Sequence, residues 1–158
     1  MGISFWRHAP HLRAAPPFQP VPLPLLNGTS VVEQPVGLHH LVAKYVEFAT
    51  DFINEQAGQG KPFYLYVPFN HIHAPNSCSA GFCGKAPRGP IGDAVEEMDW
   101  AVGQIMSTLK SAGVDDNTLT FFTSDNGAPL GNPNGLGDSD WFGNLPLRGG
   151  KVRAIAIL

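Results

Sequence analysis

Apolar residues recur at intervals of three and four positions along two stretches of the chain, the spacing of a helix that buries one face. The first stretch runs from Leu38 to Ala57 and is followed by the helix-ending residues Gly58 and Gly60. The second opens at Gly92-Asp93, where Asp93 is a candidate N-cap, and stops at Gly113. The apolar positions are Leu41, Val42, Tyr45, Val46, Ala49, Phe52 and Ile53 in the first stretch, and Val95, Met98, Val102, Ile105 and Leu109 in the second. Each stretch is therefore predicted to be an amphipathic helix that covers a sheet.

Two shorter runs, Pro62–Phe69 and Thr118–Thr123, are apolar almost throughout. Their length and composition are typical of strands buried on both faces, which predicts a mainly parallel sheet. Residues 70–90, rich in Gly, Pro, Ser and Asn, form an irregular segment between the first run and the second helix. The order helix, strand, loop, helix, strand predicts a layered α/β domain.

Polar residues follow each predicted strand directly. His71 and His73 come after the first run, and Asp125 and Asn126, followed by Gly127, come after the second. Because parallel strands end at the same edge of a sheet, we expect these side chains to meet there. A carboxylate and an amide are hard oxygen donors suited to Ca²⁺ or Mg²⁺, and an imidazole can bond a substrate oxygen or protonate a leaving group. The alternatives are an Asx turn after the second strand and histidines that only bond loop backbone.

Lys151 follows two glycines, whose lack of side chains lets the backbone approach another group closely. Beside a cation and an anionic substrate, this lysine would stabilise charge on the transferred group. The alternative is a solvated lysine, the usual environment of this residue type. Asp93, Glu96, Glu97 and Asp99 are interpreted as the acidic first turns of the second helix and are given no catalytic role.

The composition argues against several classes of function. Charged residues make up 15% of the 158 residues, the formal net charge is -3, and Lys and Arg form no cluster. Such a chain offers no electrostatic surface for nucleic acid or for an anionic membrane. No apolar run approaches the roughly 18 residues of a membrane span, and the N-terminus has no signal-peptide h-region.

Two local features are typical of proteins of the secretory pathway. Cys78 and Cys83 are close enough in sequence to form a local disulfide in an oxidising compartment. Asn27 begins an N-glycosylation acceptor pattern, Asn-Gly-Thr. Both features suit a secretory or lysosomal protein. Residues 1–20 contain several prolines and are predicted to be an extended or disordered arm.

Four ordered motifs resemble those of the sulfatases, and in particular the arylsulfatases of the arylsulfatase A type. They are Pro62 to Pro75, the helix opening at Gly92-Asp93, Thr123 to Gly127, and Leu147 to Lys151. The resemblance implies an alkaline-phosphatase-like α/β/α sandwich, present here only in part, and hydrolysis of sulfate esters. It also implies that Asp125 and Asn126 are ligands of a divalent cation, usually calcium. By the same resemblance, His73 and Lys151 contact the sulfate and stabilise the leaving group, and His71 lies near the site.

The chain also departs from the sulfatase pattern. The family's nucleophile is a formylglycine made from the cysteine of a Cys-x-Pro-Ser-Arg motif, and neither Cys78 nor Cys83 stands in one. The family's N-terminal aspartate pair is absent as well. We therefore interpret residues 21–151 as part of a sulfatase catalytic domain and residues 152–158 as a divergent tail, and we expect no useful turnover from this chain alone.

Two other classes of function stay open at the level of sequence. One is a phosphatase or phosphodiesterase of the same superfamily, which would prefer further Asp and His ligands for a second metal. The other is a non-catalytic product, either a binder that keeps half of the sulfate site or an inert fragment. The sequence specifies neither the oligomeric state nor which sulfated small molecule, glycan or lipid is the substrate.

Overall fold

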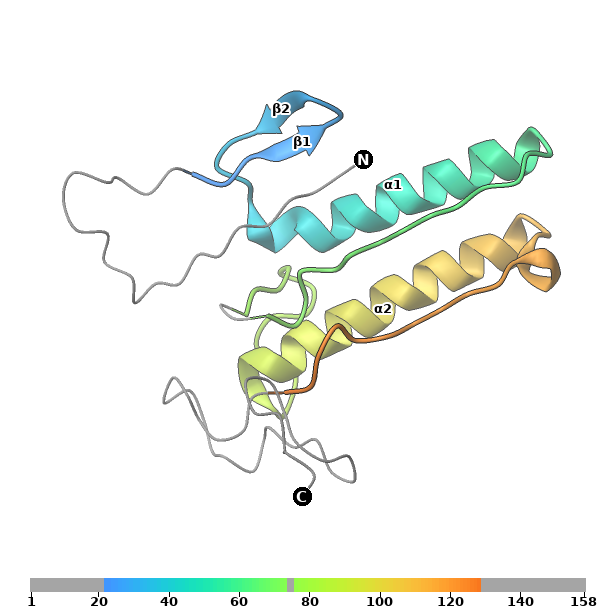
Figure 1. The fold of residues 1–158 in the computed structure, drawn as a ribbon. Coiled ribbons are helices and arrows are strands. Elements are labelled where there is room, and N and C mark those ends of the chain that lie inside the picture. The colour runs from blue at the N-terminus through green and yellow to red at the C-terminus, as the bar shows by residue number, and fades with distance from the viewer. Residues whose placement is uncertain (1–21, 74–75, 129–158) are drawn as a thin grey trace, which may run out of the picture. The chain divides into compact units, whose positions relative to one another are not determined.

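The computed structural model describes residues 22–73 and 76–128 (Figure 1). The chain divides into two compact units, residues 1–118 and 119–158. In the described residues, every helix and strand lies in the first unit: β1 (Leu25–Asn27), β2 (Ser30–Glu33), α1 (Leu38–Gly58), α2 (Gly89–Ser111) and the short 3-10 helix η1 (Asp115–Asn117). The predictions for residues 1–20 and 152–158 lie outside the described part of the chain.

The strands β1 and β2 form an antiparallel hairpin that the sequence pattern did not predict. Asn27 pairs with Ser30 across a two-residue turn, and Gly28 in that turn has a φ of 60°, a conformation that favours glycine. Leu25 of β1 is buried and contacts α1, where it forms a core cluster with Leu41 and Tyr45. The hairpin thereby covers the N-terminal half of α1.

The first predicted helix is confirmed, because α1 runs from Leu38 to Gly58. Of the predicted apolar positions, all are buried except Phe52, which is half-buried. Glu33 stabilises the helix start, since its carboxylate accepts a hydrogen bond of 2.7 Å from the Gly37 N–H and pairs with Lys44. The Lys44 ammonium and then the Gly37 N–H hold the pKa of Glu33 below its usual value.

The second helix exists, but its start and its buried face differ from the prediction. α2 begins at Gly89, so Asp93 lies within the helix and is not its N-cap. The buried residues are Gly92, Asp93, Ala94, Glu97, Ala101 and Leu109. Of the predicted stripe only Leu109 is fully buried, and Val95 is exposed. Ala101 packs against Val42 and Val46 of α1, and a small side chain at this position lets the two helices approach each other closely.

The prediction of a strand buried on both faces at Pro62–Phe69 is wrong for this structure. Among the described residues the segment pairs with no strand, and it runs back along α1, as Figure 1 shows. Phe63 contacts Phe52 near the end of α1, and Phe69 contacts Tyr45 near its start. Alternate residues are half-buried against the helices, while Tyr64 and Tyr66 are 85% and 70% exposed. The period of two is that of a strand with one covered face, but the described residues give it no hydrogen-bonding neighbour.

The second predicted strand, Thr118–Thr123, likewise pairs with no strand among the described residues, and most of it belongs to the second unit. Leu119 and Phe121 are each 84% exposed and Phe122 is 66% exposed. The predicted mainly parallel sheet is therefore not present in residues 22–73 and 76–128, where the sole sheet is the antiparallel hairpin. Apolar composition predicts burial, but a sheet also needs neighbouring strands. No helix in this part of the chain has the length and apolar character to cross a membrane.

Candidate functional site

His71 is held inside the first unit by a buried hydrogen bond to α2. Its ring nitrogen Nε2 lies 3.0 Å from Oε2 of Glu97, and the two side chains are 2% and 3% exposed. An ionised carboxylate can only accept, so Nε2 carries the proton in this arrangement. From the sequence, His71 is expected to lie near the site, and Glu97 is expected to be an acidic residue of the first helical turns without a catalytic role.

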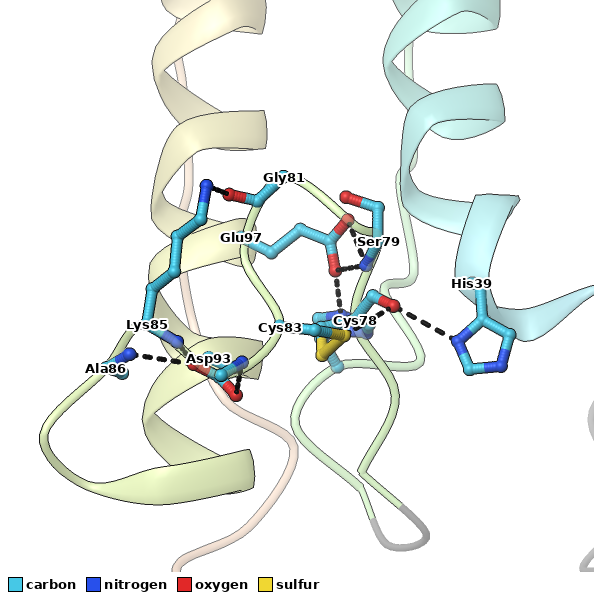
Figure 2. The surroundings of a disulfide bond; sticks show 11 residues. His39, Cys78, Ser79, Gly81, Cys83, Lys85, Ala86, Asp93 and Glu97 are labelled. Atoms are coloured by element: carbon cyan, nitrogen blue, oxygen red, sulfur yellow. Dashed lines mark hydrogen bonds and ion pairs between the residues drawn. A yellow bond between two sulfur atoms is a disulfide. The ribbon is translucent and has the colours of Figure 1, made fainter.

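Glu97 also binds the loop that follows the histidines. Its two carboxylate oxygens each lie 3.2 Å from the backbone N–H of Ser79 (Figure 2). One carboxylate on α2 thus receives hydrogen bonds from two separate segments of the chain. The position could have been noticed because Asp93, Glu97 and Ala101 stand four residues apart, which places them on one face of the helix. Apolar periodicity does not predict such a face to be buried, because two of these three residues are acidic.

The loop before α2 is closed by a disulfide between Cys78 and Cys83, whose Cα atoms are 5.3 Å apart. The carbonyl oxygen of Cys78 accepts a hydrogen bond of 3.1 Å from Nδ1 of His39 in α1 (Figure 2). This bond requires the His39 tautomer with the proton on Nδ1, or the protonated ring. The disulfide-linked loop therefore contacts α1 through His39 and α2 through Glu97.

Asp93 fixes the other end of this loop. Its carboxylate accepts hydrogen bonds of 2.8, 3.0 and 2.8 Å from the backbone N–H groups of Gly84, Lys85 and Ala86. The N–H groups of Ala86 and Gly84 hold the pKa of Asp93 below its usual value, against the opposing effect of desolvation. Asp93 thus satisfies the backbone of the preceding loop, whereas the sequence predicted that it would cap its own helix.

His73 lies in the same turn as His71 and is exposed, unlike its neighbour two positions earlier. Its backbone N–H donates a hydrogen bond of 3.0 Å to the carbonyl oxygen of Asn70, which closes the turn. The side-chain oxygen Oδ1 of Asn70 is buried without a hydrogen-bond partner among the described residues. The turn therefore presents one histidine to the interior and one to solvent.

The remaining predicted residues lie elsewhere in the chain. Asp125 and Asn126 belong to the second unit, are exposed, and stand in a local turn where the Ser124 hydroxyl donates to the Asn126 carbonyl at 2.6 Å. Lys151 lies outside the described residues. The convergence of His73, Asp125, Asn126 and Lys151 at one sheet edge stays a prediction. Asn27, the glycosylation candidate, is exposed at the tip of the hairpin.

Asp125 and Asn126 provide oxygen ligands of the type that hard cations prefer. A carboxylate and an amide oxygen are the ligand types that Ca²⁺ takes in proteins, although Ca²⁺ needs six to eight oxygens. In residues 22–73 and 76–128, no three His, Cys, Asp or Glu side chains gather as a metal site. The described residues therefore offer two suitable ligands, which is fewer than a complete site.

Comparison with known proteins shows which family this chain belongs to. The sulfatase family model matches residues 16–154, so the chain is a member of the sulfatase family. Arylsulfatase A of Bos taurus is 45% identical over 107 residues, which is 68% of this chain and 21% of that protein. Arylsulfatase A of Homo sapiens is 41% identical over the same number of residues, with the same two shares. Steryl-sulfatase of Rattus norvegicus is 36% identical over 135 residues, or 85% of this chain and 23% of that protein.

The chain spans about a fifth of the length of these relatives. Membership of the sulfatase family gives it an alkaline-phosphatase-like α/β fold. The described residues contribute two packed helices and a hairpin to such a fold. This agrees with the fold class predicted from the sequence at the level of α/β.

Proposed function

We propose that this chain is part of an enzyme that hydrolyses sulfate esters and is of the arylsulfatase type. The observation that carries the proposal is the match of the sulfatase family model to residues 16–154. The 45% identity to a bovine arylsulfatase A over two thirds of the chain supports the arylsulfatase type. The substrate class is a sulfated small molecule, glycan or lipid.

His73 and Lys151 are the residues that we assign to the sulfate group. A protonated imidazole and an ammonium attract the anionic ester and stabilise negative charge that develops on the leaving oxygen. His73 is exposed, so a substrate can reach it, whereas the side chain of His71 is buried against Glu97. We therefore assign the direct contact to His73 and a supporting place to His71.

Asp125 and Asn126 are assigned as ligands of a divalent cation, with calcium favoured by their hard oxygen donors. When bound, the cation would stabilise the negative charge of the sulfate during hydrolysis. Exposure of both residues is compatible with this role, because ligands from other parts of the protein must reach the same ion.

The 158-residue chain alone is proposed to be inactive. It contains no Cys-x-Pro-Ser-Arg motif to supply a formylglycine, and positioned charges without a nucleophile give little turnover. The purified chain should release no phenol from a chromogenic aryl sulfate. Calorimetry with calcium and then with sulfate distinguishes a retained half-site, which would bind, from an inert piece, which would not.

The decisive experiment assays the longest gene product that contains these residues. It should hydrolyse an aryl sulfate faster than the matching aryl phosphate, and calcium chelation should lower the rate. His73→Ala and Lys151→Ala should each lower kcat by about 100- to 1000-fold, the scale of a lost charge-stabilising group. Lys110→Ala, at an exposed position of α2, is the control. Wild-type rates in both alanine variants would refute the assignment, and a preference for the phosphate ester would favour a phosphatase.

The proposed compartment is the lysosome or the secretory pathway. The disulfide between Cys78 and Cys83 supports it, because such bonds persist in oxidising compartments. The exposed position of Asn27 at the hairpin tip is compatible with a glycan. A mass shift of the secreted protein on glycosidase treatment, abolished by Asn27→Gln, would support the assignment.

A further inference from the structure

Glu97 is the most enclosed carboxylate that joins separate segments of the described chain. It is 3% exposed, it contacts the ring of His71, and it accepts hydrogen bonds from the Ser79 N–H. Burying an ionised carboxylate is costly unless hydrogen bonds satisfy its oxygens. Each carboxylate oxygen of Glu97 has a hydrogen-bond partner, and these bonds offset the desolvation of the carboxylate.

We infer that Glu97 is a positioning residue for the histidine turn, defined as residues 70–73. The inference rests on the proposed function only in its last step, which concerns turnover. In the structure, the carboxylate holds the Nε2 edge of the His71 ring against α2, and an ionised carboxylate accepts this bond only from a protonated Nε2. A side chain that is itself only 3% exposed thereby sets the orientation of the His71 ring.

The effect of Glu97 reaches His73 through the backbone. Only one residue separates His73 from His71, and the His73 N–H bonds back to the Asn70 carbonyl at 3.0 Å. The four residues of the turn are thus closed by a hydrogen bond, and His71 fixes this closed turn on α2. A shift of His71 should therefore displace His73, which is exposed and can be reached by a substrate.

The same carboxylate sets the position of the next segment. Ser79 follows Cys78 directly, so the Ser79 hydrogen bonds hold one end of the disulfide-linked loop against α2. Asp93, one helical turn earlier, holds residues 84–86. Glu97 is therefore the point where the histidine turn and the disulfide-linked loop are held together. A hydrophobic pair of similar size could stabilise the fold equally well, so fold stability alone does not account for an ionisable pair here.

The first test is nitrogen-15 NMR of His71 in the unsubstituted 158-residue chain. The expected result is the tautomer with the proton on Nε2, the donor that the bond to Glu97 needs. An unprotonated Nε2 would contradict the inference directly, and this measurement needs no variant that could fail to fold. In Glu97→Gln, whose amide can also donate, the population with unprotonated Nε2 should rise. Glu96→Gln, at the exposed neighbouring position, should leave the His71 signals unchanged.

The second test measures kinetics in the longest gene product. Glu97→Gln should lower kcat roughly 10- to 100-fold, the range seen when a carboxylate that orients a functional histidine is removed. The unfolding midpoint should change little, because glutamine keeps the shape and an acceptor for Ser79. Unchanged kcat in a folded Glu97→Gln variant would overturn the positioning role. If the parent lacks sulfatase activity, the proposed function fails, whereas the NMR result still decides whether Glu97 fixes His71.

Discussion

Buried polar atoms dominate the chemistry at the scale of single residues. His71 and Glu97 satisfy each other, and Asp93 satisfies three backbone N–H groups. Tyr45 and Asn70 are exceptions, because the Tyr45 hydroxyl and the side-chain oxygen of Asn70 are buried without a hydrogen-bond partner in the described residues. Burial also raises the pKa of Tyr45 well above its usual value of 10.0. An unpaired buried hydroxyl costs free energy without any compensating bond.

Tyr45→Phe should therefore raise the free energy of unfolding, by about 1 kcal/mol at neutral pH. Because the folded-state pKa lies above the unfolded one, the wild-type chain should lose stability as the pH rises above 10.0, where only the unfolded state ionises at Tyr45. The phenylalanine variant should lack this part of the loss. Urea unfolding at neutral and alkaline pH checks both points, with the exposed Tyr64→Phe as control. A loss of stability in Tyr45→Phe would indicate a partner for the hydroxyl.

Close packing at the start of α2 is the main feature at the scale of elements. A Cβ atom added at Gly92 would lie 2.7 Å from the Cβ of Ala86 and 2.9 Å from that of Arg88. Gly92 therefore lets the loop segment held by Asp93 lie directly on the helix. Gly103, about three turns further along the same helix and exposed, has no atom within 4 Å of the corresponding position.

Gly92→Ala and Gly103→Ala should have opposite effects on stability. Gly92→Ala should lower the free energy of unfolding by about 1 to 2 kcal/mol, because the clash outweighs the gain in helix propensity. Gly103→Ala should raise it by up to roughly 1 kcal/mol, since only the propensity changes. Thermal unfolding of both variants followed by circular dichroism provides the measurement. Equal stabilisation by the two substitutions would show that the loop does not pack on Gly92.

Exposed apolar side chains are the main feature at the scale of the whole molecule. In the first unit, Tyr64 and Tyr66 are exposed on an unpaired extended segment. In the second unit, Leu119, Phe121 and Phe122 are exposed on another. Unpaired backbone beside apolar side chains favours association with other chains. Each segment has the composition of a buried strand, but residues 22–73 and 76–128 provide no neighbouring strand that would bury it.

The 158-residue chain should consequently self-associate as its concentration rises. Replacing Phe121 and Phe122 together by serine should raise the dissociation constant for self-association at least about tenfold. A tenfold change in a dissociation constant corresponds to about 1.4 kcal/mol, which is less than the loss of burial of two phenylalanine side chains. Sedimentation velocity over a range of concentrations measures this change. Met106→Ser, which removes a partly exposed apolar side chain from α2, is the control and should have little effect. A monomer at every concentration would contradict the prediction.

The sequence by itself determined the features that depend on local pattern. The periodicity of residues 38–57 determined α1 and its buried face, because helix amphipathicity is set by neighbours three and four positions away. The ordered motifs from Pro62 to Lys151 indicated the sulfatase family, which the comparisons show. The assignments of His73, Asp125, Asn126 and Lys151 came from the same motifs and stay proposals.

Only the tertiary structure decided which polar residues are buried. Glu97 and Asp93 occupy the inner face of α2 because partners distant in sequence, His71, Ser79 and residues 84–86, satisfy their oxygens. Hydrophobic periodicity considers only the polarity of each side chain and not its hydrogen-bond partners. The predicted buried face of α2 is therefore displaced by about one position from the observed face. It also predicted strands at two apolar runs, because composition records a tendency to be buried, whereas pairing depends on what lies alongside in space.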